Sequence, residues 1–237
     1  MNLKARRAGV LTSGLAIAAV GLSGSGAGAA GPSEGLPTFT DPAKITNPYL
    51  PFSDNPKTKA RGIVDGKRIR SEKELLNRTE RFEVGDQTVR AAVVRDRSYQ
   101  NGNLHERALD FYAQADDGTV YYLGEDVNYY NPAGDVVGHR GSFRYGKETD
   151  TLGVAMPADP QVGDRYVFED VPGQGSEKNR VASVDADIEV PAGGFKNALR
   201  VEGQVMPEDE RELKWYARGI GVLAEEGHDG TVELVKP

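Results

Sequence analysis

The sequence contains no cysteine among its 237 residues, which excludes disulfides, thiolate metal sites and cysteine nucleophiles. Only three histidines are present (His105, His139 and His228), and they lie far apart, without the spacing of zinc ligands. A G-x-S-x-G serine motif, a phosphate-binding glycine loop and a dinucleotide fingerprint are also missing. The familiar signatures of catalysis are therefore absent, and we expect no cofactor, with calcium as the one exception considered below.

Basic residues are fewer than acidic ones. The chain has 29 Lys and Arg against 36 Asp and Glu, a formal net charge of −7. An acidic protein would approach nucleic acid against its own electrostatic field, so we do not expect a nucleic-acid partner. In contrast, 29 glycines, 13 prolines and 10 tyrosines favour strands and tight turns over long helices.

Long apolar runs are confined to the N-terminus. A basic segment (residues 1–7) precedes an uncharged, mostly apolar one (residues 8–22), and Ala27-Gly28-Ala29 then supplies the small residues of a cleavage site. This order is typical of a signal peptide, so we expect residues 1–29 to be removed and the product to be secreted. No later stretch reaches the length of a transmembrane helix, and no cysteine is available for lipidation. The Arg6-Arg7 pair leaves both Sec and Tat export open.

The rest of the chain has the regularly spaced turn signals of an all-β protein. Turn-forming pairs such as Asp65-Gly66 and Asn101-Gly102 separate short runs with alternating or β-branched residues. We predict a single antiparallel β domain over residues 61–237, a meander of about ten strands curved into a half-barrel, barrel or sandwich. Residues 30–60, rich in Pro, Gly, Asn and Asp, are predicted to form an irregular arm across it. Residues 71–78 fit a short helix as well as a strand.

The residues around Asp117-Gly118 predict a hairpin with two conceivable registers. A two-residue turn would place Asp110 opposite Glu125, a like-charge pair that gains nothing unless a cation lies between them. A type I turn with a left-handed glycine bulge instead pairs Ala115 with Thr119 and keeps the apolar side chains on one face. We choose the second register.

This register gives the hairpin two different faces. The apolar face, together with the single tryptophan of a later strand, is expected to line a concave ligand cavity. The predicted ligand-binding residues are Leu109, Phe111, Tyr121, Leu123 and Trp215. The second face is polar and rich in tyrosine. It carries Glu106, Asp110, Tyr112, Gln114, Tyr122, Glu125 and Asp126.

Clustered carboxylates on the polar face allow two kinds of chemistry. The candidates for acid–base catalysis are Glu106, Asp110, Tyr122 and Lys214. The candidates for oxygen ligands of calcium are Asp110, Glu125 and Asp126. Strand alternation alone also produces a polar face that is simply solvated, and we prefer that interpretation.

Four segments carry a resemblance to a known group of proteins. They are Asp110–Gln114, Val120–Asp126, Met156–Pro160 and Lys214–Val222. They resemble a family of uncharacterised secreted bacterial proteins with the pattern D-x-Y-A-Q, V-x-Y-x-G-E-D, M-P-A-x-P and Y-A-x-G-x-G. The family supplies no catalytic residues. The closing hairpin is also similar to periplasmic lipoprotein-carrier-like proteins, which implies a half-barrel around an apolar cavity.

Residues 57–81 hold nine basic residues against four acidic ones. They fit either a docking strip for an anionic cell-envelope polymer or a charged sheet edge that resists aggregation, and we prefer the edge. Taken together, the sequence favours a secreted, non-enzymatic binding protein for an apolar or amphiphilic ligand. A secreted hydrolase or lyase acting on an extracellular polymer is the alternative, and a structural or surface-interaction protein is a third.

Overall fold

A computed structural model describes residues 35–235, which form an antiparallel all-β fold. The predicted signal peptide over residues 1–29 lies outside this range. The described residues contain fourteen strands and no helix, so no helix long and apolar enough to cross a membrane occurs among them. The predicted fold class is confirmed, with more strands than the turn signals indicated.

The strands follow one another as a meander. Their bounds are β1 Lys57–Val64, β2 Lys67–Val84, β3 Gln87–Gln100, β4 Asn103–Gln114, β5 Val120–Tyr130, β6 Val136–Gly138, β7 Phe143–Arg144, β8 Gly153–Met156, β9 Arg165–Val171, β10 Gly175–Val190, β11 Gly193–Met206, β12 Glu210–Ala217, β13 Gly221–Gly227 and β14 Gly230–Leu234. The sheet order is β6-β5-β4-β3-β2-β1-β14-β13-β12-β11-β10-β9, and β7 and β8 pair with β5. The first and last strands meet in the middle, where β1 pairs with β14.

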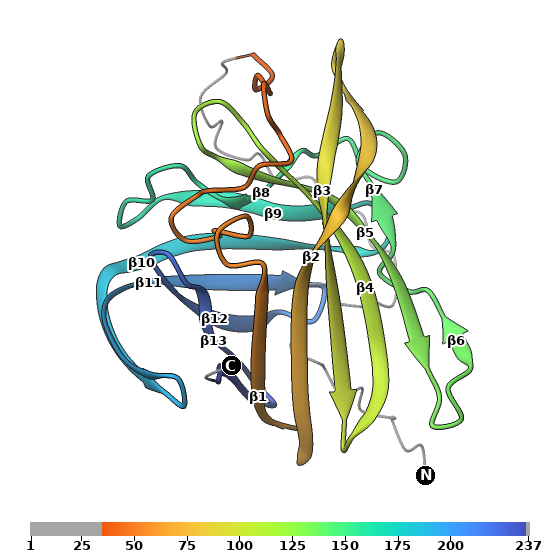
Figure 1. Ribbon diagram of the computed structural model, residues 1–237, viewed down its shortest axis with the longest axis vertical. Helices are drawn as coiled ribbons and strands as arrows, with labels where there is room; N and C mark the ends of the chain where they lie inside the picture. Colours follow the sequence, from red (N-terminus) through yellow and green to blue (C-terminus); the bar gives the residue numbers. More distant parts are fainter. Residues whose placement is uncertain (1–34, 236–237) are drawn as a thin grey trace.

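The sheet folds over on itself. Strands β1 to β5 run along the long axis of the molecule, and β9 to β12 cross them behind (Figure 1). The ends come close where Gly153 of β8 lies against the backbone of Phe168 in β9, so closely that a Cβ on Gly153 would clash with the Phe168 carbonyl oxygen. No strand pairing joins β8 to β9 among the described residues. The sheet is thus strongly curved without being closed, as in a half-barrel.

The hairpin of β4 and β5 has the predicted turn. Ala115 and Thr119 flank it, the Ala115 amide donates to the Thr119 carbonyl at 2.9 Å, and Gly118 has a φ of 95°. A second irregularity at Gly124, with a φ of 125°, then shifts the register by one residue. As a result Asp110 lies directly opposite Glu125. The like-charge pair is therefore present, contrary to the predicted register, because the hairpin contains a second bulge at Gly124 in addition to the one at Gly118.

The basic segment 57–81 lies in the middle of the sheet. It covers β1 and most of β2, and β1 is paired on both sides, with β14 and with β2. The expectation of a sheet edge is therefore wrong, because the C-terminal strand covers the edge that β1 would otherwise expose. Residues 71–78, which fitted a helix or a strand, lie within β2.

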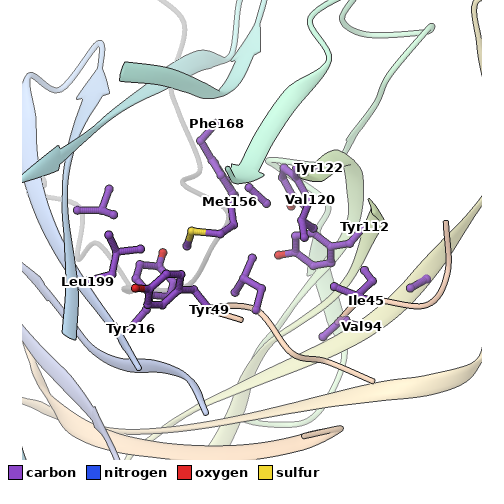
Figure 2. Close-up of a cluster of buried hydrophobic side chains, with 14 of the residues drawn as sticks. Ile45, Tyr49, Val94, Tyr112, Val120, Tyr122, Met156, Phe168, Leu199 and Tyr216 are labelled. Atoms are coloured by element: carbon purple, nitrogen blue, oxygen red, sulfur yellow. The ribbon is translucent and has the colours of Figure 1, made fainter. Parts of the chain in front are cut away.

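The interior between the two halves of the sheet holds one large apolar cluster. Figure 2 shows Tyr112 and Tyr122 of the first half facing Phe168 and Leu199 of the second. The rings of Tyr122 and Phe168 are stacked with centroids 4.8 Å apart, so β5 and β9 are in contact across the interior. Such burial of large side chains supplies most of the free energy that holds the halves together.

The irregular segment before β1, residues 35–56 (the arm), belongs to this interior. Ile45 and Tyr49 are buried in the cluster (Figure 2). Asn47 is also buried, and its amide nitrogen donates to the carbonyl oxygens of Gly118 and Pro157, each at 3.0 Å. The arm is therefore fixed by backbone-directed hydrogen bonds as well as by apolar packing.

Candidate functional site: an interior cavity

A cavity of about 80 Å³ lies between the arm and the inward faces of both halves of the sheet (the interior cavity). Its apolar lining comes from the arm and from strands of both halves. These residues are Leu50, Pro51, Phe52, Ala60, Ala155, Phe168, Ile220, Val222, Leu223, Val232 and Leu234. Its polar lining is formed by Asn55, Thr58, Ser71, Lys73, Asp96, Tyr112, Asn179, Lys214, Tyr216 and Glu225. The cavity is thus amphipathic.

The arm supplies one wall of the interior cavity. Phe52 packs on Tyr112 of β4 with ring centroids 5.2 Å apart. Asn55 fixes the far end of this wall by donating to the Ile220 carbonyl oxygen at 2.8 Å. Access to the cavity consequently depends on how the arm is held.

Two lysines on the polar side are paired with carboxylates. The Nζ atom of Lys214 lies 2.8 Å from Glu177 and 3.2 Å from Glu212, and that of Lys73 lies 2.9 Å from Asp96. Burial lowers the pKa of Lys214, but Glu177 and Glu212 outweigh it and hold this pKa well above the usual value. Both lysines therefore remain charged in the folded protein.

Acids outnumber these lysines in the interior. The buried carboxyl groups are Asp96, Glu106, Asp110, Glu125, Glu169, Glu177, Glu212 and Glu225. Burial, reinforced by Glu177, raises the pKa of Glu169 to about 8. Burial also raises the pKa of Asp110 and of Glu125, and each is in addition raised by neighbouring carboxylates. Eight acids against two lysines give the interior an excess of acidic groups.

Glu225 of β13 is a further acid of the cavity. It is 8% exposed, lines the cavity and lies directly opposite Lys214 in the β12–β13 pairing. Lys214 nevertheless makes its ion pairs with Glu177 and Glu212. The Glu225 carboxylate still acts on both lysines of the cavity, since it contributes to the raised pKa of Lys73 and of Lys214.

Three of the four predicted catalytic residues lie outside the lining of the interior cavity. Glu106, Asp110 and Tyr122 are between 0% and 3% exposed, and none of them lines the interior cavity. Lys214 does line it. The polar face that we expected to be solvated is thus buried, because the second half of the sheet folds over it. A substrate in this cavity would not contact the Asp110 carboxylate or the Tyr122 hydroxyl.

The predicted metal ligands are split between two faces. Asp110 and Glu125 are opposite each other on the inward face. Asp126 points the other way and binds Arg144 at 2.8 Å. Among residues 35–235, no group of three or more His, Cys, Asp or Glu side chains is arranged to hold a metal ion. The Gly124 bulge explains the split, since it keeps Glu125 facing inward and turns Asp126 outward.

The five predicted ligand-binding residues do not line the interior cavity. Phe111 and Leu123 are buried on the opposite face of the β4–β5 hairpin, and Leu109 packs against the same cluster. Tyr121 contacts Phe39 of the arm, with ring centroids 5.8 Å apart. Trp215 packs in a further cluster with Ala217 and Leu223. The alternation of polar and apolar residues correctly separated the two faces of the hairpin, but it carries no information on which face lies on the concave side of the sheet.

Several lining residues were not singled out from the sequence. Lys73 was counted with the basic strip, and Asp96, Phe168 and Glu225 were not considered. A signal was nevertheless present, because Ser71 and Lys73 alternate with outward charges along β2, as Asp96 and Ser98 do along β3. Polar residues at every second position of two paired strands indicate a polar inward face.

Comparison with known proteins adds little on function. No protein-family model matches the chain, and no curated protein matches it. One similar solved structure is a Bacteroides fragilis protein described as exported with a YmcC-like fold, at 12% identity, with 75% of this chain and 92% of that chain covered and a TM-score of 0.41. Another, from Parabacteroides distasonis, is described as a lipoprotein, with the same identity and coverage and a TM-score of 0.29. At these scores neither likeness bears on function.

Proposed function

We propose that this is an exported, non-enzymatic binding protein that holds a small amphiphilic molecule in the interior cavity. The observation that carries the proposal is the amphipathic lining of the interior cavity, with apolar side chains of the arm and both sheet halves around a few convergent polar groups. Ligand sites typically combine these two features. Export is supported by the order of charges and small residues before residue 30 and by the motif likeness to secreted proteins.

Binding has better support than catalysis. A general acid or base must come within hydrogen-bond reach of the reacting atoms. The acids with the most strongly perturbed surroundings, Asp110 and Glu125, lie away from the cavity lining. The lysine that does line it, Lys214, is committed to two ion pairs.

The size of the cavity limits what it encloses. Benzene fits a cavity of about 150 Å³, so about 80 Å³ accommodates a short chain of roughly five non-hydrogen atoms. The ligand is thus a small amphiphile, or the end of a longer molecule whose remainder lies outside.

Native mass spectrometry of the protein purified from the secreted fraction tests this proposal. We expect a noncovalent adduct that denaturing conditions remove. Ala60 lines the cavity, so Ala60→Leu should fill it and abolish the adduct. Ala133 is exposed in a loop, and Ala133→Leu is the matched control that should keep the adduct. A folded wild-type protein without an adduct, or an adduct that survives Ala60→Leu, would overturn the proposal.

A further inference from the structure

We propose that the outward side of strands β1 to β4 is a docking surface for a linear polymer of repeating phosphate groups. These strands run side by side (Figure 1), and eight basic side chains share their outward side on adjacent cross-strand rows (the basic face). They are Lys57, Lys59, Arg61, Arg68, Arg70, Arg95, Arg97 and Arg107. The acids on the same rows are Glu72 and Glu74. The alternate residues point the other way, as Thr58 and Ser71 do in lining the interior cavity.

Two pairs of arginines lie directly opposite each other on the basic face. Arg61 of β1 is opposite Arg70 of β2, and Arg97 of β3 is opposite Arg107 of β4. Like charges in such positions destabilise a sheet. The chain carries this cost twice on adjacent rows, although its net charge is −7. An anion placed between the two guanidinium groups of a pair removes their repulsion.

The two acids of the basic face do not neutralise it. Glu72 forms ion pairs with both Arg70 and Arg97, and the other acid is shared in the same way by two further basic side chains. Arg61 and Glu233 of β14 are opposite each other without forming an ion pair. Among residues 35–235, no ion pair reaches four members of the face, Lys59, Arg61, Arg68 and Arg107. The face therefore keeps a local excess of positive charge on an acidic protein.

The spacing of these groups favours a polymer over a single small anion. Adjacent strands lie about 4.8 Å apart, and successive outward residues of one strand about 6.7 Å apart. Because the two arginine pairs occupy neighbouring rows, a chain of linked anionic groups can contact both pairs at once. Guanidinium groups bind phosphate oxygens through paired hydrogen bonds. The tetrahedral oxygens of a phosphate can accept from both arginines of a pair, whereas a planar carboxylate presents its oxygens in one plane.

The shape and composition of the basic face disfavour a membrane and a nucleic acid. The face is convex, since the sheet folds over on its other side, so a planar bilayer would contact only part of it. Membrane-surface binding also requires apolar side chains, and among the described residues of these rows Ile63 is the exposed large hydrophobic. Single-stranded nucleic acids stack on free aromatic rings. The Tyr99 ring of this face is instead covered by Arg70, whose guanidinium carbon lies 3.8 Å from the ring centroid.

Calorimetric titration of the secreted protein with four probes tests the proposal: linear polyphosphate, polygalacturonate, single-stranded oligothymidylate and phosphatidylglycerol vesicles. We expect polyphosphate to bind most tightly at equal ionic strength and to weaken as salt is added. A double variant, Arg61→Gln with Arg107→Gln, should weaken polyphosphate binding roughly tenfold and reduce its salt dependence. The matched control combines Arg165→Gln with Arg211→Gln, which removes the same charge from exposed positions in the second half of the sheet. It should retain at least most of the wild-type affinity.

Each outcome decides the proposal. Absence of polyphosphate binding overturns it. Binding that survives the Arg61 and Arg107 substitutions, or that the control weakens equally, overturns the basic face as the docking surface. Equal or tighter binding of polygalacturonate, oligothymidylate or vesicles overturns the phosphate polymer as the partner. The interior cavity lies on the other side of the sheet, so the adduct experiment with Ala60→Leu decides the proposed function separately.

Discussion

Asp110 of β4 and Glu125 of β5 are directly opposite each other in the antiparallel register, and both carboxyl groups are buried. Burial raises the pKa of each; Asp110 raises that of Glu125 further, and burial outweighs the lowering effect of Lys73 on Asp110. The folded protein therefore holds protons that the unfolded chain releases at lower pH. Because these folded-state pKa values are raised, the stability they contribute is complete below the unfolded pKa and is lost as the pH rises towards the folded one.

We accordingly expect the free energy of unfolding to decrease between about pH 5 and pH 8, by up to about 1.4 kcal/mol per pH unit for each retained proton. Asp110→Asn needs no proton to be neutral, so it should flatten this dependence. Urea unfolding at several pH values measures the slope. Asp126→Asn is the control, because Asp126 lies on the other face in an ion pair with Arg144. Equal slopes for wild type and Asp110→Asn would contradict the expectation.

Glu169 offers a direct titration. Burial and the neighbouring Glu177 raise its pKa to about 8, from 4.5 for an ordinary glutamate. We expect a carboxyl carbon resonance with a titration midpoint near 8 in the nuclear magnetic resonance spectrum, absent from the spectrum of Glu169→Gln. If every glutamate resonance has its midpoint below about 6, Glu169 is hydrated in solution and the prediction fails.

Lys214 should be essential for stability. Lys214→Met removes the cation from Glu177 and Glu212 and leaves both acids buried, so we expect a loss of about 3–5 kcal/mol in the free energy of unfolding. Lys196→Met removes an exposed ion pair with Asp187 and should change stability within experimental error. Chemical denaturation of both variants at neutral pH gives the comparison. Similar losses of unfolding free energy in the two variants would mean that the ion pairs of Lys214 with Glu177 and Glu212 are solvated.

The sequence predicted the class of the fold because the relevant signals are local. Turn residues such as Asn101-Gly102 separate alternating strands wherever the chain places them, and the Ala115–Thr119 turn follows from its own few residues. The sense of curvature is not local. Both faces of the β4–β5 hairpin are buried, and alternation cannot tell which of them the second half of the sheet covers.

The interior cavity was not predicted, because its lining also depends on long-range strand pairing that local sequence signals do not record. Glu225 and Lys73 belong to strands β13 and β2, which are distant in sequence and meet only because β1 pairs with β14. That pairing joins the two ends of the domain, and no short motif records it. The sequence indicated that inward polar residues exist, but it did not indicate which of them share a cavity.

Asn47 should hold the arm in place. Its side chain donates to the Gly118 and Pro157 carbonyl oxygens and accepts from the Tyr49 amide, so Asn47→Ala leaves three buried groups without partners. At about 1 kcal/mol per hydrogen bond, we expect a loss of roughly 2–4 kcal/mol. Limited proteolysis should then cut the arm faster. Asn103→Ala, at an exposed position, is the control and should resist proteolysis as wild type does.

Gly124 creates the register that brings Asp110 and Glu125 together, and its substitution should be costly. Its φ is 125°, and a Cβ there would lie 2.2 Å from the Phe143 carbonyl oxygen, which belongs to the neighbouring strand and cannot move away. Gly134 has a comparable φ of 90° with open space around it. Gly134→Ala therefore measures backbone strain alone, about 1–2 kcal/mol, whereas Gly124→Ala adds the clash and should cost at least about 3 kcal/mol or prevent folding. Thermal unfolding compares the two variants, and equal losses would show that the bulge relaxes without strain on β7.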